Sequence, residues 1–462
     1  MINLLRSHKN DAKITHQQLP LAEATPDHPK AKELKKISEI LDTNSSIYAL
    51  VLQDLGSIGS KTGAQGMTAE QVLRAAIIKQ MEGFSYRELA FHLMDSRVYG
   101  WFCRIGIGRT FKKSTLQRGV KSISDNTWEQ INRILLGYAE DNKIEKGRKV
   151  RVDCTVVESN IHAPWDSELL VDSVRVLARV LTTVKTELPD LVFSFSDHRR
   201  RARRRNLAIM NAKNTADRKK MYKDLLLVTE NTIGYAERCL HVLRPYCPSF
   251  LDAWRLTGWA KEQLEHFLPL ARQVVCQTRR RVFEGESVPA PEKIVSIFEP
   301  HTDIIRKDRR DTYYGHKICL TGGASNLILD CVILEGNPAD SELTETMLDR
   351  QNAVYGRYPL KAAFDGGFSS QENLKKAKGK KGLKDVCFSK GRGLSVKDMC
   401  RSNWVYKQLR NFRAGIESGI SWLKRSLGLD RCLWKGFESF KSYVWASIVS
   451  ANLLTIARHQ LA

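Results

Sequence analysis

The sequence predicts an α/β protein in which a mixed sheet is preceded by a helical domain and interrupted by a large helical insertion. Helical periodicity dominates up to about residue 145, and a β-branched run at 150–157 then gives the first strand. A helical stretch at 165–290 separates this strand from the remaining ones. A chain of 462 residues can bury several cores. The expected parts are residues 1–60, 61–145, 146–164 together with 291–462, and 165–290.

The first part of the chain reads as a polar arm followed by helices. Residues 1–45 are polar and carry prolines and a lysine cluster, which indicates a loosely ordered arm that leads into a first helix. Thr68 is a suitable cap for a helix at 69–81, and Ser85 with Glu88 forms a capping box for the next one. Two helices joined by a short turn are compatible with a helix-turn-helix, but also with a plain packing unit.

The first strand contains a carboxylate. A helix is expected at about 126–140, a basic turn follows, and the strand at 150–157 carries Asp153 in its middle. A carboxylate inside an apolar strand is costly unless it is paired or binds a cation. The alternative is an edge strand on which Asp153 faces water.

Two basic runs lie in or beside the helical stretch, at 198–205 and 279–281. Such runs are usually solvated faces. On a chain this basic, the first run is better interpreted as a clamp for backbone phosphates, because guanidinium groups bind phosphate through two hydrogen bonds. Its members are Arg199, Arg200, Arg201, Arg203, Arg204 and Arg205.

Strand character returns after the helical stretch and delivers a second carboxylate. Apolar runs at 314–321 and 327–334, joined by a Gly-Gly turn, predict a hairpin. A strand at 360–364 ends directly at Asp365, and Ser369 or Ser370 caps the helix that follows. Further strands are expected at 293–298 and 385–388, and further helices at 169–184, 217–243, 254–277, 340–355 and 437–458.

A third carboxylate lies on a helix expected at 403–427. Arg413, Glu417 and Lys424 are spaced so that they share one face of this helix, and Arg410 extends the row by a turn. One acid among bases suits a site that holds a metal ion and binds phosphates. The alternative is an exposed helix with ordinary ion pairs.

Charge and composition limit the class of protein. The chain has 74 Lys and Arg against 51 Asp and Glu, a net charge of +23, which implies a polyanionic partner, most simply nucleic acid. A basic protein of the membrane surface is the competing interpretation. No run of 18 apolar residues and no signal peptide is present, so we expect a soluble, intracellular protein. The ten cysteines form no C-x-x-C pair, which argues against structural zinc and disulfides.

Five motifs in order carry a resemblance to a known family. They are Asp153-Cys154-Thr155 with the trailing segment 161–170, Tyr314-Gly315-His316-Lys317, Gly336-Asn337-Pro338-Ala339-Asp340-Ser341, Phe364-Asp365-Gly366-Gly367-Phe368, and Arg413, Glu417 and Lys424 as R-x3-E-x6-K. With these motifs the chain resembles the DDE transposases of bacterial insertion sequences from about residue 60 to its end. The family usually has a tyrosine where this chain has Arg410.

The resemblance implies an RNase H-like mixed sheet with a helical N-terminal domain and a large helical insertion after the first strand. It implies that Asp153, Asp365 and Glu417 are catalytic and hold two Mg²⁺ ions about 4 Å apart, for which Mn²⁺ can substitute. It further implies that Arg410, Arg413 and Lys424 bind DNA. His162 and His316 stay outside the expected catalytic set, since a lone histidine is more often structural.

The expected function is that of a transposase that binds the terminal inverted repeats of its element, cleaves at the element ends and joins them to target DNA. Residues 61–145 would bind DNA or mediate dimerisation, and 146–164 with 291–462 would form the catalytic domain. The partners would be double-stranded DNA, as element ends and target, and a second copy of the chain in the DNA complex, with no membrane. The place would be the bacterial cytoplasm at the nucleoid. A catalytically inactive repressor or architectural protein, and a simple nuclease, are the alternatives.

Overall fold

The computed structural model describes residues 27–462 except 57–65, 107, 249, 308–310 and 392. The chain divides into two compact units. The first combines Met1–Asn160 with His316–Ala462, and the second is Ile161–Gly315. Each unit has its own hydrophobic core.

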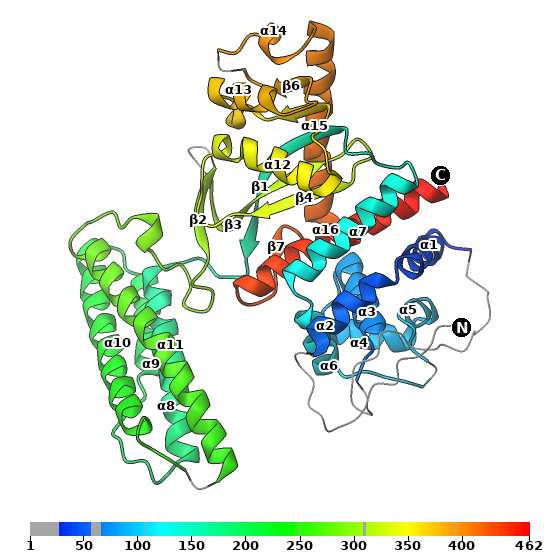
Figure 1. The fold of residues 1–462 in the computed structure, drawn as a ribbon. Coiled ribbons are helices and arrows are strands. Elements are labelled where there is room, and N and C mark those ends of the chain that lie inside the picture. Colours follow the sequence, from blue (N-terminus) through cyan, green and yellow to red (C-terminus); the bar gives the residue numbers. More distant parts are fainter. Residues whose placement is uncertain (1–26, 57–65, 107, 249, 308–310, 392) are drawn as a thin grey trace. The chain divides into compact units, whose positions relative to one another are not determined.

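The N-terminal part of the first unit is helical (Figure 1). Helix α3 (Ala69–Glu82) lies at its centre, with all but its last residue buried, and begins with the capping box of Thr68 and Gln71. Helix α4 begins with the predicted capping box of Ser85 and Glu88. The other helices are α1 (Pro29–Thr43), α2 (Ser46–Gly56), α4 (Tyr86–Asp95), α5 (Arg97–Phe102), α6 (Lys113–Ser122) and α7 (Asp125–Asp141).

The structure corrects the interpretation of residues 1–60 as an arm. Helices α1 and α2 fall inside this stretch, and Leu34, Ile37 and Ile47 are fully buried in the core of the first unit. The lysines that suggested an arm lie mainly on the polar faces of an amphipathic helix. The remainder of the predicted arm, residues 1–26 and 57–60, lies outside the described residues.

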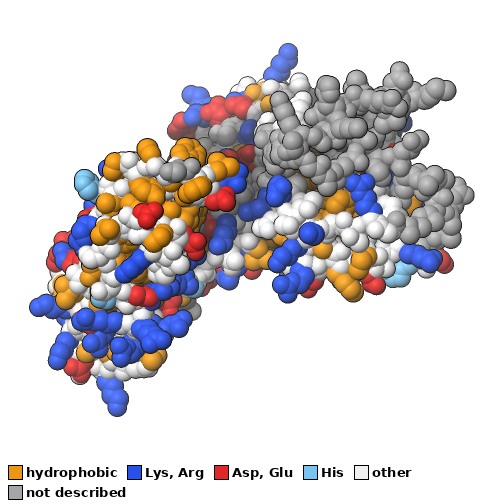
Figure 2. Space-filling view, turned by 90° about the horizontal axis from the view of Figure 1, so that it is seen from below, with side chains coloured by type: hydrophobic (Ala, Val, Ile, Leu, Met, Phe, Trp, Pro, Cys, Tyr) orange, Lys and Arg blue, Asp and Glu red, His pale blue; other side chains and the backbone are white. Residues whose placement is uncertain are grey.

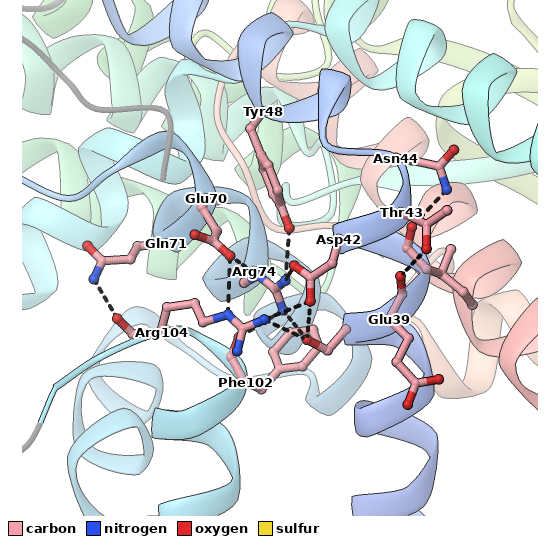
Figure 3. A network of polar contacts seen from close by, with 12 residues as sticks. Glu39, Asp42, Thr43, Asn44, Tyr48, Glu70, Gln71, Arg74, Phe102 and Arg104 are labelled. Atoms are coloured by element: carbon pink, nitrogen blue, oxygen red, sulfur yellow. Dashed lines mark hydrogen bonds and ion pairs between the residues drawn. The ribbon is translucent and has the colours of Figure 1, made fainter. Parts of the chain in front are cut away.

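A buried arginine connects α1, α2, α3 and α5 (Figure 3). The Arg74 side chain is fully buried and pairs with Asp42 at 2.7 Å and with Glu70 at 3.1 Å. It also donates to the Tyr48 hydroxyl at 2.9 Å and to the carbonyl of Phe102 at 3.1 Å. A buried guanidinium is tolerated only when its donors are satisfied in this way, so the network fixes how these helices meet.

Seven strands within the described part of the chain form one mixed sheet, in the order β2-β3-β1-β5-β6, with β4 beside β3 and β7 beside β1. The strands β1, β5 and β6 run parallel, whereas β2, β3 and β4 are antiparallel neighbours. The bounds are β1 (Lys149–Ser159), β2 (Asp303–Lys307), β3 (Asp311–Gly322), β4 (Ile328–Ile333), β5 (Lys361–Phe364), β6 (Asp385–Phe388) and β7 (Arg431–Cys432).

Helices of the C-terminal half cover this sheet. Helix α15 (Asn403–Ser426) contacts β1, β5 and β6, and the largely buried α16 (Phe437–Leu461) lies beside α7 (Figure 1). The other helices are α12 (Thr344–Tyr355), α13 (Gln371–Gly379) and α14 (Val396–Met399), with short 3-10 turns at Asp340–Leu343 and Gly366–Phe368. Eight of the ten cysteines are buried.

The second unit is mainly a bundle of four helices, drawn in green tones in Figure 1. They are α8 (Asp166–Glu187), α9 (Arg199–Met210), α10 (Thr215–Leu243) and α11 (Leu251–Val282), followed by a 3-10 turn at Ala290–Glu292. The strand predicted at 293–298 is wrong. Ile294 bonds through both backbone groups to the side chain of Gln277 on α11, so a side chain takes the place of a neighbouring strand, and Val295 and Ile297 are buried.

Candidate active site

The central strand β1 presents Asp153 to one face of the sheet. Successive side chains of a strand alternate between the two faces, so Arg151 and Asp153 share one. The Asp153 side chain is 15% exposed, and β1 lies between β3 and β5. An edge-strand aspartate facing water is therefore excluded.

Asp365 comes to the same place because β5 runs parallel to β1. Val152 is paired in register with Phe364, so each aspartate follows a paired residue at the same edge of the sheet. The hydroxyl of Ser389, which follows β6, donates to Oδ1 of Asp365 at 2.8 Å.

The surroundings of Asp365 favour its ionised form. Burial alone would raise its pKa, but the backbone N–H of Gly366, the Ser389 hydroxyl and the charges of Arg413 and Lys390 outweigh it, and the pKa of Asp365 is lowered. This carboxylate is therefore an anion at neutral pH.

Helix α15 brings a guanidinium into contact with three carboxylates. Nη2 of Arg413 lies 3.0 Å from Oδ2 of Asp153 and 3.1 Å from Oδ1 of Asp365, and Nη1 lies 2.7 Å from Oε1 of Glu417. The acids come from a central strand, from the end of its neighbour and from a helix near the C-terminus. Sequence separates them widely, and the fold gathers them around one cation.

The docking of α15 depends on residues that the sequence reasoning missed. Arg151 donates to the carbonyl of Phe412 at 3.0 Å and to Oδ1 of Asn326 at 2.6 Å. A Cβ on Gly415 would lie 2.2 Å from Nη1 of Arg151, so a side chain at this position would displace the guanidinium from its hydrogen bonds. The available signal was a second charged residue, two positions before Asp153, in the same apolar strand.

Two family models match the chain. A transposase DDE domain matches residues 279–453, which include Asp365, Arg413 and Glu417, and a transposase domain (DUF772) matches residues 22–121. The chain belongs to the DDE transposases of bacterial insertion sequences. Searches of curated proteins and of solved structures gave no match. Membership of this family implies a DNA substrate and a nuclease or transposase type of enzyme.

The donor set of the transposase suits a hard divalent cation. Three carboxylates converge, and the Asp365 and Glu417 side chains are 38% and 61% exposed, so their oxygens are accessible from solvent. In the described part of the chain, no three His, Cys, Asp or Glu side chains lie close enough to share an ion. The three acids meet through the Arg413 guanidinium, which contacts each of them.

The remaining residues of the α15 row are arranged differently. Lys424 forms an ion pair with Asp430 at 3.5 Å, and Arg410 is exposed and forms no ion pair within the described residues. His316 is buried against the rings of Phe437 and Phe440, which is a packing position.

The arginine block lies on α9 of the second unit. Three of its six arginines form ion pairs with carboxylates of the same unit. Arg199 pairs with Asp197, and Arg201 and Arg205 both pair with Asp224. Figure 2 shows Lys and Arg side chains gathered along one side of the helical bundle. The three arginines that are exposed and form no ion pair in the described ranges are Arg200, Arg203 and Arg204.

None of the helices in the described part of the transposase is long and apolar enough to cross a bilayer.

Proposed function

We propose that this transposase binds the terminal inverted repeats of its insertion sequence, cleaves phosphodiester bonds at the element ends and joins those ends to target DNA. Asp153, Asp365 and Glu417 are the catalytic carboxylates, carried by a sheet of the RNase H-like type. The observation that supports this is the convergence of three acids from distant elements on the one guanidinium of Arg413. Folding alone does not require three carboxylates at one place, because their mutual repulsion destabilises the fold.

Two Mg²⁺ ions, or Mn²⁺ in their place, would be held by Asp153, Asp365 and Glu417. When bound, they would activate the attacking oxygen and stabilise charge on the leaving oxygen. The protein's own contribution is positioning. Ser389 fixes the carboxylate of Asp365, and Arg151 fixes α15 against β1.

DNA phosphates are bound by the cations around the site. Arg413 and Lys424 would hold the DNA end, and Arg410 is an exposed cation one turn before Arg413. A homodimer in the DNA complex is part of the proposal, because an element has two ends that must be processed together.

The catalytic assignment is tested by Asp153→Asn, Asp365→Asn and Glu417→Gln. Each change removes a negative charge but little volume, so cleavage of labelled element ends in Mg²⁺ should be lost while DNA binding is retained. Glu335→Gln, at an exposed acid of the same unit, is the matched control. A variant that kept wild-type cleavage would remove its residue from the set. Wild-type protein that binds the ends without cleaving them would instead identify a catalytically inactive repressor.

The arginine block offers an internal control for phosphate binding. Replacing Arg200, Arg203 and Arg204 by alanine should flatten the log-log salt dependence of DNA binding by up to about 0.9 per lost phosphate contact. Replacing the three paired arginines, Arg199, Arg201 and Arg205, should change the slope less, because carboxylates already neutralise them. Equal slopes for both triple variants and the wild type would show that the block is a solvated surface.

A further inference from the structure

Helix α6 in the N-terminal part of the first unit has one buried and one polar face. Leu116 and Val120 are 0% and 1% exposed and pack into the core. The opposite face carries Ser114, Gln117 and Lys121 at intervals of three and four residues, with Arg118 beside Gln117. These side chains line a hollow of about 460 Å³ together with Ser122. A helix face of this composition can donate hydrogen bonds along its whole length.

The charge of this region is of one sign. From Arg97 to Ser124 the sequence contains seven Lys and Arg but no Asp or Glu. In the ranges that the structure describes, Lys112, Lys113, Arg118 and Lys121 form no ion pair, although many other cations of the protein do. Positive side chains left without carboxylate partners over a continuous face indicate that an external polyanion neutralises them.

The neighbouring helix α4 provides the contrast. Its exposed face carries two acids, Glu88 and Asp95, and one cation, Arg87, together with the apolar Phe91 and Met94. Acids repel phosphates, so α4 is the unsuitable helix of the pair for contact with nucleic acid. The sequence pattern at 69–90 is compatible with a helix-turn-helix from α3 and α4, in which the second helix would enter the groove, but α4 is the helix with the two exposed acids.

Helix α6 packs closely against α3. A Cβ on Gly119 would lie 3.0 Å from Cγ2 of Val72, so the two helices approach closely. Ten residues give α6 a length of about 15 Å, and a helix with its side chains fits the major groove of B-DNA, which is about 12 Å wide. A rigid scaffold positions side chains for sequence recognition better than a loop does.

We infer that α6 enters the major groove of double-stranded DNA and reads base edges with Gln117, Arg118 and Lys121. Arginine and lysine recognise guanine, and glutamine recognises adenine, through the groove edges of these bases. Lys112 and Lys113, at the start of the helix, contact the flanking phosphates. The inference rests on the proposed function and deepens it, because it names the element that recognises the inverted repeat.

The experiment compares affinity for a duplex that carries one element end with affinity for a scrambled duplex of the same length. Gln117→Ala and Arg118→Ala are the test variants. The controls are Gln53→Ala on α2, which removes an exposed amide as Gln117→Ala does, and Lys35→Ala on α1, which removes an exposed cation as Arg118→Ala does. Each test variant should lower the ratio of specific to non-specific affinity by about 5- to 150-fold, the effect of one lost bidentate base contact. The controls should leave the ratio unchanged, and all four variants should keep the wild-type melting temperature.

Two outcomes would overturn the inference. Test variants that retain the wild-type ratio would show that α6 does not read the end. An equal loss of affinity for both duplexes would reduce α6 to a non-specific phosphate contact. Failure of the proposed function would look different, because the wild type itself would then not distinguish the element end from the scrambled duplex.

Discussion

Replacing Arg413 by glutamine tests whether this guanidinium holds the three acids together in the absence of metal. The substitution keeps a polar side chain on α15 but removes the positive charge. Asp153, Asp365 and Glu417 are then left with no cation in contact with all three. Their repulsion is uncompensated, so the first unit should lose stability.

The size of the effect follows from burial. Removing one partner from a fully buried ion pair costs about 3–5 kcal/mol, whereas an exposed pair is worth at most about 1 kcal/mol. Arg413 and Asp153 are each 15% exposed, but Asp365 and Glu417 are 38% and 61% exposed. Solvent therefore screens two of the three contacts, and the expected loss is about 2–3 kcal/mol, or about 5 °C in the melting temperature.

The same substitution should raise the affinity of the protein for divalent metal ions, although it lowers the stability of the metal-free protein. If the proposed divalent ions bind these carboxylates, they must displace Arg413 in the wild type but not in Arg413→Gln. If the whole stability loss of about 2–3 kcal/mol reappears as metal affinity, half-maximal thermal stabilisation should need about 30- to 150-fold less Mg²⁺ or Mn²⁺ in the variant. Thermal unfolding at increasing metal concentration, without DNA, measures both effects.

Arg410→Gln is the control, because Arg410 lies one turn earlier on α15, is exposed and forms no ion pair with a described residue. It should unfold like the wild type, with the same metal dependence. Equal melting temperatures and equal metal dependence for the two variants would refute the reasoning, since Arg413 would then neither hold the acids together nor compete with metal.

Three further predictions concern the same unit. Gly415→Ala should cost about 1–3 kcal/mol, because the new methyl group displaces the bonded Arg151, whereas Gly419→Ala, with open space around it, should be neutral or stabilising in the same unfolding assay. Lys424→Ala should lower strand transfer at least about tenfold but cost less than about 1 kcal/mol of stability, because its only ion pair in the described structure is solvent-exposed; an unchanged rate would remove it from the DNA contacts. The lowered pKa of Asp365 contributes stability that is present above its unfolded pKa of about 4 and is lost as pH falls through its folded pKa, so metal-free Asp365→Asn should lose less stability than the wild type on acidification below about pH 4.

Local signals allowed most secondary structure to be predicted. The cap Thr68 and the capping box of Ser85 and Glu88 predicted where α3 and α4 begin, and β-branched runs located β1 and the β3–β4 hairpin. The prediction was wrong for residues 29–56, where apolar residues at helical spacing are surrounded by many polar ones. Residues 29–56 contain many charged and polar side chains, but Leu34, Ile37 and Leu41 recur at helical spacing and are fully buried. Prolines and lysines on the outer face led to the interpretation as an arm.

The candidate site could be predicted only in part. Helical spacing predicts that Arg413 contacts Glu417, and the structure has this pair at 2.7 Å. It cannot predict the contacts of Arg413 with Asp153 and Asp365, because these depend on how α15 crosses the sheet. The crossing is set by Arg151, buried under the helix, and no spacing within α15 reveals a partner on β1.

The charge of the site explains why an arginine stands at its centre. Three ionised carboxylates carry three negative charges, and Arg413 neutralises one of them. In the proposed reaction two divalent ions bring four positive charges and the scissile phosphate one negative charge, so the acids are balanced without Arg413. A guanidinium released from these carboxylates can instead bind a DNA phosphate through two parallel hydrogen bonds. A lysine in this position would offer one compact ammonium group and could not contact the acids through two separate nitrogens.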